Sequence, residues 1–251
     1  MHPPLTFVIC ATPRTGSTLL CALLAASGVA GRPESFYRAE DRAEWAEEWG
    51  VPCDSGGSPD PVSYLEAAIR AGQSANGVCG IRIQAETLPV FLDEIRTLYA
   101  ETCDDGELLA KAFGPCHFIW CRRGDDVAQS ISRLKAEISQ VWHLDGTEPK
   151  SPDHRAVYDA SRIDGFRAEI AEGNARWARW FAANSITPAV LDYETFATDP
   201  QHHVRALIAS AGLDLSRDTA LTVPNRRMAD AESAVWAARY RSERGLAPFL
   251  C

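Results

Sequence analysis

The sequence predicts an α/β fold: a three-layer sandwich with a central parallel sheet and a P-loop-like phosphate-binding loop. Short apolar runs rich in β-forming residues recur along the chain, and each is followed by a segment with the apolar spacing of a helix. Strands that alternate with helices form parallel sheets covered on both faces, and such sheets bind ligands at the carboxyl ends of their strands.

Four strand and helix pairs carry this prediction. The expected strands are 6–11, 78–84, 117–121 and 189–193, and the helices that follow them are 17–27, 88–100, 125–142 and 201–212. A long helix is expected within 153–184, where Phe166, Ile170, Trp177, Trp180 and Phe181 form an apolar stripe that favours core packing. The stretches 37–61 and 144–152 do not fit the alternation, and we expect them to be surface excursions near the mouth of an active site.

The composition excludes several classes of protein. A chain of 251 residues with 46% hydrophobic and 24% charged residues suits one globular domain, expected to span 1–251. A net charge of -9 argues against a general nucleic-acid binder, which needs a basic surface. The first apolar run is too short to span a membrane and has no basic leader, so a cytoplasmic location is expected. The eight cysteines show no metal-binding spacing and are expected to be reduced thiols.

The strongest local pattern is TPRTGST at 12–18, between the first strand and the first helix. A helix N-terminus there offers unpaired N–H groups, a glycine lets the backbone approach a ligand, and the hydroxyl and arginine side chains add donors. The candidate phosphate contacts are Pro13, Arg14, Thr15, Gly16, Ser17 and Thr18. The alternative is an ordinary helix cap at Ser17. The lysine and first glycine of nucleotide triphosphatase loops are absent, which disfavours magnesium-dependent chemistry.

Two further patterns lie at the ends of later strands. Arg122 ends the third strand and Ser130 follows in the second turn of the next helix, where the two side chains could meet on one phosphate. The alternative is a surface arginine and an ordinary helical serine. A Tyr-Glu-Thr-Phe run at 193–196, followed by Asp-Pro at 199–200, comes after the fourth strand.

Together these three patterns resemble the sulfotransferase superfamily that uses 3'-phosphoadenosine 5'-phosphosulfate (PAPS). In that superfamily the first loop holds the 5'-phosphosulfate, and an arginine followed eight residues later by a serine holds the 3'-phosphate. The sequence is similar to the bacterial trehalose 2-sulfotransferase-like group over most of its length, including 28–33, 76–82 and 227–241. The resemblance implies PAPS as co-substrate, a carbohydrate or glycolipid acceptor resembling trehalose, and no metal. It also implies a late basic loop over the 3'-phosphate, with Arg226 or Arg227 as the contact. The alternative for these arginines is a solvated basic turn.

Sulfuryl transfer needs a base for the acceptor proton and positive charge on the leaving group. Arg14 is expected to stabilise the leaving phosphate. Arg82 matches a basic position near the sulfuryl group in the resembling family, the alternative being a strand-end ion pair. Glu34 is expected to be the general base and to contact the acceptor, although it stands one place earlier than the acid of that group. The alternative for Glu34 is a surface carboxylate.

Two other functions stay open from the sequence. One is a small-molecule kinase with a modified P-loop, which magnesium dependence and ATP turnover would reveal. The other is a catalytically silent nucleotide-binding protein. No motif identifies the acceptor, although Trp45, Trp49 and Trp142 near the excursions could stack on sugar rings. The expected partners are the small-molecule or glycolipid acceptor and, as an open possibility, a second copy of the chain in a homodimer.

Overall fold

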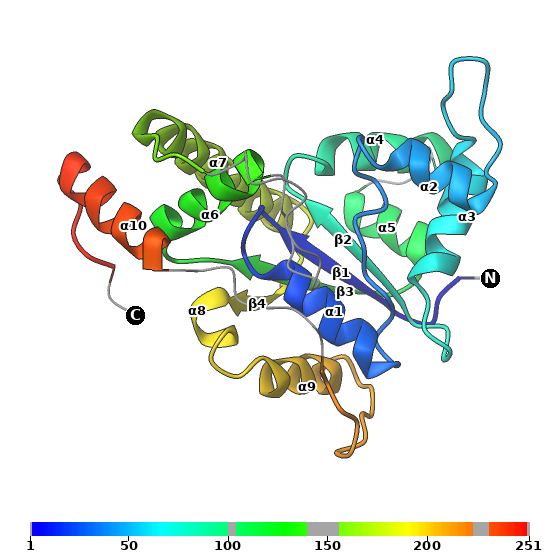
Figure 1. The fold of residues 1–251 in the computed structure, drawn as a ribbon. Helices are drawn as coiled ribbons and strands as arrows, with labels where there is room; N and C mark the ends of the chain where they lie inside the picture. Colours follow the sequence, from blue (N-terminus) through cyan, green and yellow to red (C-terminus); the bar gives the residue numbers. More distant parts are fainter. Residues whose placement is uncertain (1, 100–103, 140–155, 223–230, 250–251) are drawn as a thin grey trace.

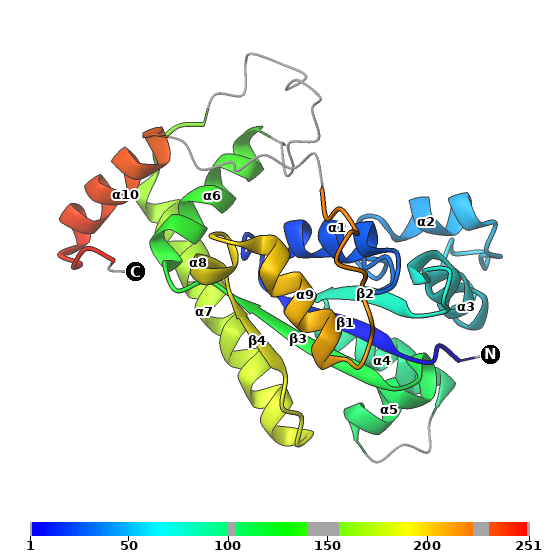
Figure 2. The ribbon, with the colours of Figure 1, turned by 90° about the horizontal axis from the view of Figure 1, so that it is seen from below.

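A computed structural model describes residues 2–99, 104–139, 156–222 and 231–249. Its centre is a sheet of four parallel strands in the order β2-β1-β3-β4 (Figures 1 and 2). The strands are β1 (Thr6–Ala11), β2 (Cys79–Gln84), β3 (Cys116–Arg122) and β4 (Ala189–Asp192). β1 pairs in parallel with both β2 and β3, so Thr6 lies opposite Cys79 and Cys116. The predicted α/β class with a central parallel sheet is confirmed.

Side chains alternate between the two faces of β1, as the period of two in a strand requires. Val8 and Cys10 pack with helices α3 (Pro61–Gly72), α4 (Leu88–Leu98), α5 (Asp105–Phe113) and α7 (Ala160–Ala183). Phe7 and Ile9 pack on the other face with α1 (Ser17–Ser27), α8 (Tyr193–Phe196) and α9 (Pro200–Ser210). Helices therefore cover both faces, and each large apolar side chain buried there contributes about 1.5–3 kcal/mol.

A third apolar cluster lies beside the sheet, where α6 (Asp126–Ser139) packs against α7 and α10 (Ala231–Arg244). Its buried members include Val127, Ile131 and Leu134 of α6 and Tyr240 of α10. Figure 1 shows α6 and α10 together, separated from α2 to α5 by the sheet and α1. Because α6 begins just after β3, it lies at the carboxyl edge of the sheet, where ligands are expected.

The structure contains helices that the sequence analysis did not expect. Helix α2 (Arg42–Trp49) lies inside the first predicted excursion, and α5 precedes β3. The sequence of α2, RAEWAEEW, is rich in charged residues and only Ala46 is fully buried. It therefore lacks the apolar spacing that predicts a helix. The predicted strand 189–193 is one residue too long, since Tyr193 already begins α8. The excursion at 144–152 lies outside the described residues. Within the described ranges, no helix has the length and apolar character needed to cross a membrane.

Candidate active site at the end of β1

The loop after β1 has an unusual backbone. Arg14 and Gly16 both adopt left-handed conformations, with φ of 70° and 80°. A Cβ on Gly16 would lie 2.8 Å from Cδ2 of Tyr193, so only glycine fits there. Gly16 is also the N-cap of α1 and has no side chain that could cap the first N–H groups. These groups can therefore serve an anion instead.

Two guanidinium groups lie beside this loop. Arg14 Nε donates to Ser132 Oγ of α6 at 3.0 Å, and Arg123 Nη1 donates to the carbonyl oxygen of Arg14 at 3.3 Å. Burial lowers the pKa of Arg14 to about 10, and the charge of Arg123 adds to this effect. A bound anion would relieve the repulsion between the two cations, so the cluster suits a phosphate or sulfate group.

The predicted phosphate contacts Arg122 and Ser130 have other partners in the structure. Arg122 pairs with Asp192, with Nη2 at 2.9 Å from Oδ1. Ser130 is 0% exposed, and its hydroxyl donates to a carbonyl oxygen one turn earlier in its own helix. No described contact brings the two together. Nearby, Arg123 and Ser132 contact Arg14 of the phosphate loop, which the sequence analysis missed because their spacing of nine residues differs from the eight of the Arg and Ser pattern.

The Tyr-Glu and Asp-Pro run has a structural role in the described contacts. The Glu194 carboxylate accepts hydrogen bonds from the backbone N–H groups of Gly124 and Asp125, both at 3.1 Å. Asp199 caps α9 by accepting from the N–H of His202 at 3.1 Å. Glu194 thus holds the turn between β3 and α6, the helix that carries Ser132.

Arg82 joins the acceptor-side candidates into one network. The Arg82 side chain, on β2, is buried, and its guanidinium donates to three oxygens. Nε donates to Ser35 Oγ at 2.7 Å, Nη1 to Thr18 Oγ1 at 2.8 Å, and Nη2 to Glu34 Oε1 at 2.6 Å. Thr18, Glu34 and Arg82, which were predicted separately, therefore lie together between α1 and β2.

Two glycines let the segment that carries Glu34 lie against β2. Gly31 has a φ of 74°, and a Cβ there would lie 2.4 Å from the nitrogen of Gly80. A Cβ on Gly80 would in turn lie 2.8 Å from the nitrogen of Pro33. This close approach lets the backbone N–H of Arg82 donate to the carbonyl oxygen of Glu34 at 3.0 Å. The position of Glu34 is thus set by the backbone as well as by its ion pair.

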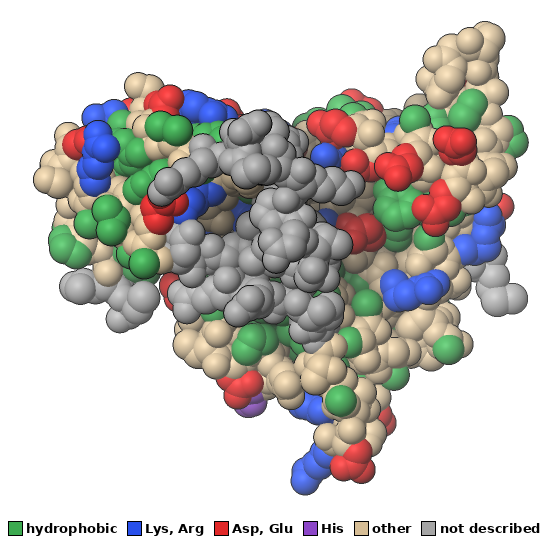
Figure 3. Space-filling view, in the orientation of Figure 1, with side chains coloured by type: hydrophobic (Ala, Val, Ile, Leu, Met, Phe, Trp, Pro, Cys, Tyr) green, Lys and Arg blue, Asp and Glu red, His purple; other side chains and the backbone are tan. Residues whose placement is uncertain are grey.

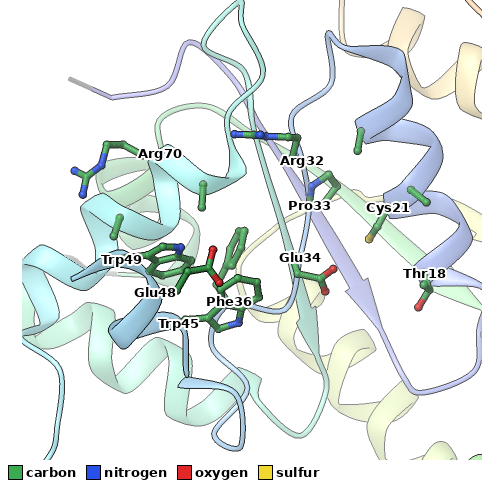
Figure 4. A pocket seen from close by; sticks show the side chains of 14 residues that line it. Thr18, Cys21, Arg32, Pro33, Glu34, Phe36, Trp45, Glu48, Trp49 and Arg70 are labelled. Carbon is green, nitrogen blue, oxygen red and sulfur yellow. The ribbon is translucent and has the colours of Figure 1, made fainter. Parts of the chain in front are cut away.

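A pocket of about 780 Å³ opens beside this network (Figure 4). Thr18 and Glu34 lie at one side, and Trp45, Glu48 and Trp49 of α2 lie across from them. The two indole rings stack with centroids 5.2 Å apart and planes inclined by 21°. Acidic side chains gather on the surface over α2 in Figure 3. The volume is that of a typical small-molecule site.

Arg226, Arg227 and Trp142 lie outside the described residues. In the part of the chain that the structure describes, no three histidine, cysteine, aspartate or glutamate side chains group in a way that could hold a metal ion.

Comparison with known proteins identifies the family. The profile of the Stf0 sulphotransferases matches residues 6–243. The chain belongs to the Stf0 sulphotransferase family. The resemblance stated from the sequence is thereby confirmed, and membership makes this Stf0 protein a sulfotransferase-family enzyme. It also favours sulfuryl transfer over the kinase alternative.

Relatives of this Stf0 protein include two enzymes named trehalose 2-sulfotransferase. The one from Mycobacterium tuberculosis is 28% identical over 260 residues, covering 94% of each chain. The one from Mycolicibacterium smegmatis is 26% identical over 263 residues, covering 96% of each. Among solved structures, the sulfotransferase domain of the Synechococcus olefin synthase matches with a TM-score of 0.49 and 14% identity, over 96% of this chain and 88% of that one.

Proposed function

We propose that this Stf0 protein transfers the sulfuryl group of PAPS to a hydroxyl of a carbohydrate or glycolipid acceptor resembling trehalose. One observation carries the proposal: the Glu34 carboxylate lines a pocket that begins at α1, the helix of the phosphate loop. A carboxylate in that place stands between an anion site and a cavity for a small molecule, as a general base for transfer must.

The residues of the phosphate loop suit the donor. Gly16 leaves the N-terminus of α1 open, and Arg14 and Arg123 add positive charge beside it. We propose that Pro13, Arg14, Thr15, Gly16, Ser17 and Thr18 hold the 5'-phosphosulfate, and that Arg122, Ser130, Arg226 and Arg227 remain the candidates for the 3'-phosphate. When bound, PAPS supplies an activated sulfuryl group with a nucleotide phosphate as leaving group.

Glu34 acts on the acceptor in this proposal. The two hydrogen bonds described for its carboxylate, from Arg82 Nη2 and from the backbone N–H of Ser35, both end on Oε1. Oε2 is therefore the oxygen that takes the proton of the acceptor hydroxyl. As the acceptor oxygen forms its bond to sulfur, the bond between sulfur and the bridging phosphate oxygen breaks. Arg14 then neutralises the charge that develops on the leaving phosphate.

The opposite wall of the pocket suits a sugar. Indole faces such as those of Trp45 and Trp49 pack on the apolar faces of sugar rings, and a carboxylate such as that of Glu48 accepts hydrogen bonds from hydroxyl groups. The relatives named trehalose 2-sulfotransferase support a disaccharide as the first acceptor to test. The predicted cytoplasmic location, single domain over 1–251 and homodimer stay predictions.

The test is transfer in the presence of a chelator. The protein is incubated with PAPS, EDTA and a panel of sugars headed by trehalose, and sulfated products and 3',5'-adenosine bisphosphate are measured by mass spectrometry. Sulfated sugar is the expected result. A parallel incubation replaces PAPS with ATP, with and without added magnesium. Phosphorylated sugar that forms there only with magnesium would favour the kinase. Binding of the bisphosphate without transfer to any acceptor would favour a silent nucleotide-binding protein.

A further inference from the structure

Gln129 of α6 is a buried polar residue with no place in the proposed chemistry. It is 0% exposed, and its amide nitrogen Nε2 donates to Thr12 Oγ1 at 3.0 Å and to the carbonyl oxygen of Pro13 at 2.7 Å. Its amide oxygen Oε1 is buried and has no hydrogen-bond partner within the described residues. A buried, unpaired oxygen costs stability, so Gln129 is a poor choice as a mere core filler.

Both hydrogen bonds of Gln129 go to the start of the phosphate loop. The same stretch is held from α7, where Trp177 Nε1 donates to the carbonyl oxygen of Ala11 at 2.9 Å. A Cβ on Gly173 of α7 would lie only 2.7 Å from Cγ2 of Thr12. Thr12 therefore lies between α6 and α7, with its methyl group against Gly173 and its hydroxyl hydrogen-bonded to Gln129.

The loop needs such support because Arg14 is strained. A residue other than glycine in the left-handed region is unfavourable and persists only where its surroundings hold it. Gln129 fixes the two residues immediately before Arg14, and Ser132, one helical turn further along α6, accepts a hydrogen bond from the Arg14 side chain. One face of α6 thus contacts both the backbone leading to Arg14 and its guanidinium group.

We infer that Gln129 is a positioning residue for the donor. It holds Thr12 and Pro13 so that Arg14 keeps its left-handed backbone and directs its guanidinium toward the 5'-phosphosulfate. Gln129 acts only through the loop and does not touch the donor. The inference rests on the proposed function, since it concerns the donor site of that function.

The test compares two ligands that differ at the 5' end. Binding of 3',5'-adenosine bisphosphate and of adenosine 3'-monophosphate is measured by calorimetry on the full chain and on the Gln129→Met variant, which fills the same space without donating. The Kd for the bisphosphate is expected to rise about tenfold or more, equivalent to the loss of one modest interaction, while the Kd for the monophosphate stays within about twofold. Turnover with PAPS is expected to fall with it.

Two further variants make the result specific. Gln129→Glu keeps the side-chain shape but presents only acceptor oxygens to the Pro13 carbonyl when ionised, so it should repeat the selective loss. Ile131→Ala removes a buried side chain from the same helix and serves as the control. It should lower the melting temperature and leave the ratio of the two Kd values unchanged.

The outcomes distinguish a failure of the positioning role of Gln129 from a failure of the proposed function. Equal weakening of both ligands by Gln129→Met, or no change in either, would overturn the positioning role while leaving the proposed function intact. If Gln129→Met does not fold, the same readings apply to Gln129→Glu. Failure of the wild-type chain to bind the bisphosphate would refute the proposed function, and the inference about Gln129 with it.

Discussion

At the residue scale, the proposed acceptor side of the site depends on how the Glu34 carboxylate is held. Arg82 and the backbone N–H of Ser35 both contact Oε1 of Glu34, and the side chain of Glu34 is still 46% exposed. An oriented carboxylate with one oxygen free of described partners can accept a proton from a molecule in the pocket. The ion pair therefore serves to position Glu34, and it leaves the carboxylate accessible.

Replacing Glu34 by glutamine tests this role. The change keeps the volume and removes the basic oxygen, so turnover should fall by about 10²–10⁴, a barrier increase of roughly 3–5 kcal/mol. Affinity for 3',5'-adenosine bisphosphate should be preserved, as calorimetry would show. Ser35→Ala should lower turnover far less, because alanine keeps the backbone N–H that contacts Glu34 and removes only the hydroxyl that accepts from Arg82 Nε. Near-normal turnover of Glu34→Gln with its acceptor would identify Glu34 as a surface carboxylate.

The two missed residues show a limit of sequence reading at this scale. Arg122 ends β3 and Arg123 follows it, and the sequence does not show which of these two adjacent side chains faces the phosphate loop. Ser130 and Ser132 lie about 200° apart around a helix, since each residue advances about 100°. One hydroxyl therefore faces its own helix backbone while the other meets Arg14. Spacing alone does not distinguish these choices.

At the element scale, α7 supports the phosphate loop through close packing at Gly173 as well as through the hydrogen bond from Trp177 to Ala11. Gly173 lies against Thr12 and Ala85, with hypothetical Cβ distances of 2.7 Å to Thr12 Cγ2 and 3.1 Å to Ala85 Cβ. Gly165, two turns earlier in the same helix, is exposed and has nothing within 4 Å of its hypothetical Cβ. The helix thus offers two glycines with opposite surroundings.

Alanine at these two positions should have opposite effects. Gly165→Ala should raise the free energy of unfolding by up to about 1 kcal/mol, because alanine has the higher helix propensity. Gly173→Ala should lower it by about 1–3 kcal/mol through overpacking, and should also reduce sulfuryl transfer by moving Thr12. Urea unfolding measures the stability of each variant, and a turnover assay measures its sulfuryl transfer. A stabilised, fully active Gly173→Ala variant would show that α7 does not constrain the phosphate loop.

The strands were easier to predict than the helices over the pocket. β1 reads as an apolar run because both of its faces are buried in the three-layer fold. Helix α2 has the opposite character, since its partly buried tryptophans Trp45 and Trp49 are set among charged residues. Its helical state depends on packing against Phe36 and its neighbours, which a single sequence does not reveal. The pocket wall that should recognise the acceptor was therefore the least predictable part of the site.

At the scale of the whole molecule, a net charge of -9 contrasts with a local arginine cluster. A polyanion would meet mostly unfavourable charge, whereas a small anion can reach Arg14 and Arg123 at the edge of the sheet. The proposed donor site draws on β1, β3 and α1, which share one apolar cluster, and on α6, which belongs to another. A ligand that bridges these elements should stabilise the whole fold.

This leads to a prediction for thermal unfolding. At a hundred times its Kd, 3',5'-adenosine bisphosphate should stabilise the native state by about 2.7 kcal/mol. For a chain of this size, that corresponds to a rise in melting temperature of roughly 5–10 °C. Adenosine 5'-monophosphate at the same concentration should produce a much smaller rise, because it lacks the 3'-phosphate. Sodium chloride at matched ionic strength controls for general salt effects. Equal shifts from both nucleotides would refute a 3'-phosphate site, whether formed by Arg122 and Ser130 or by the late arginines Arg226 and Arg227.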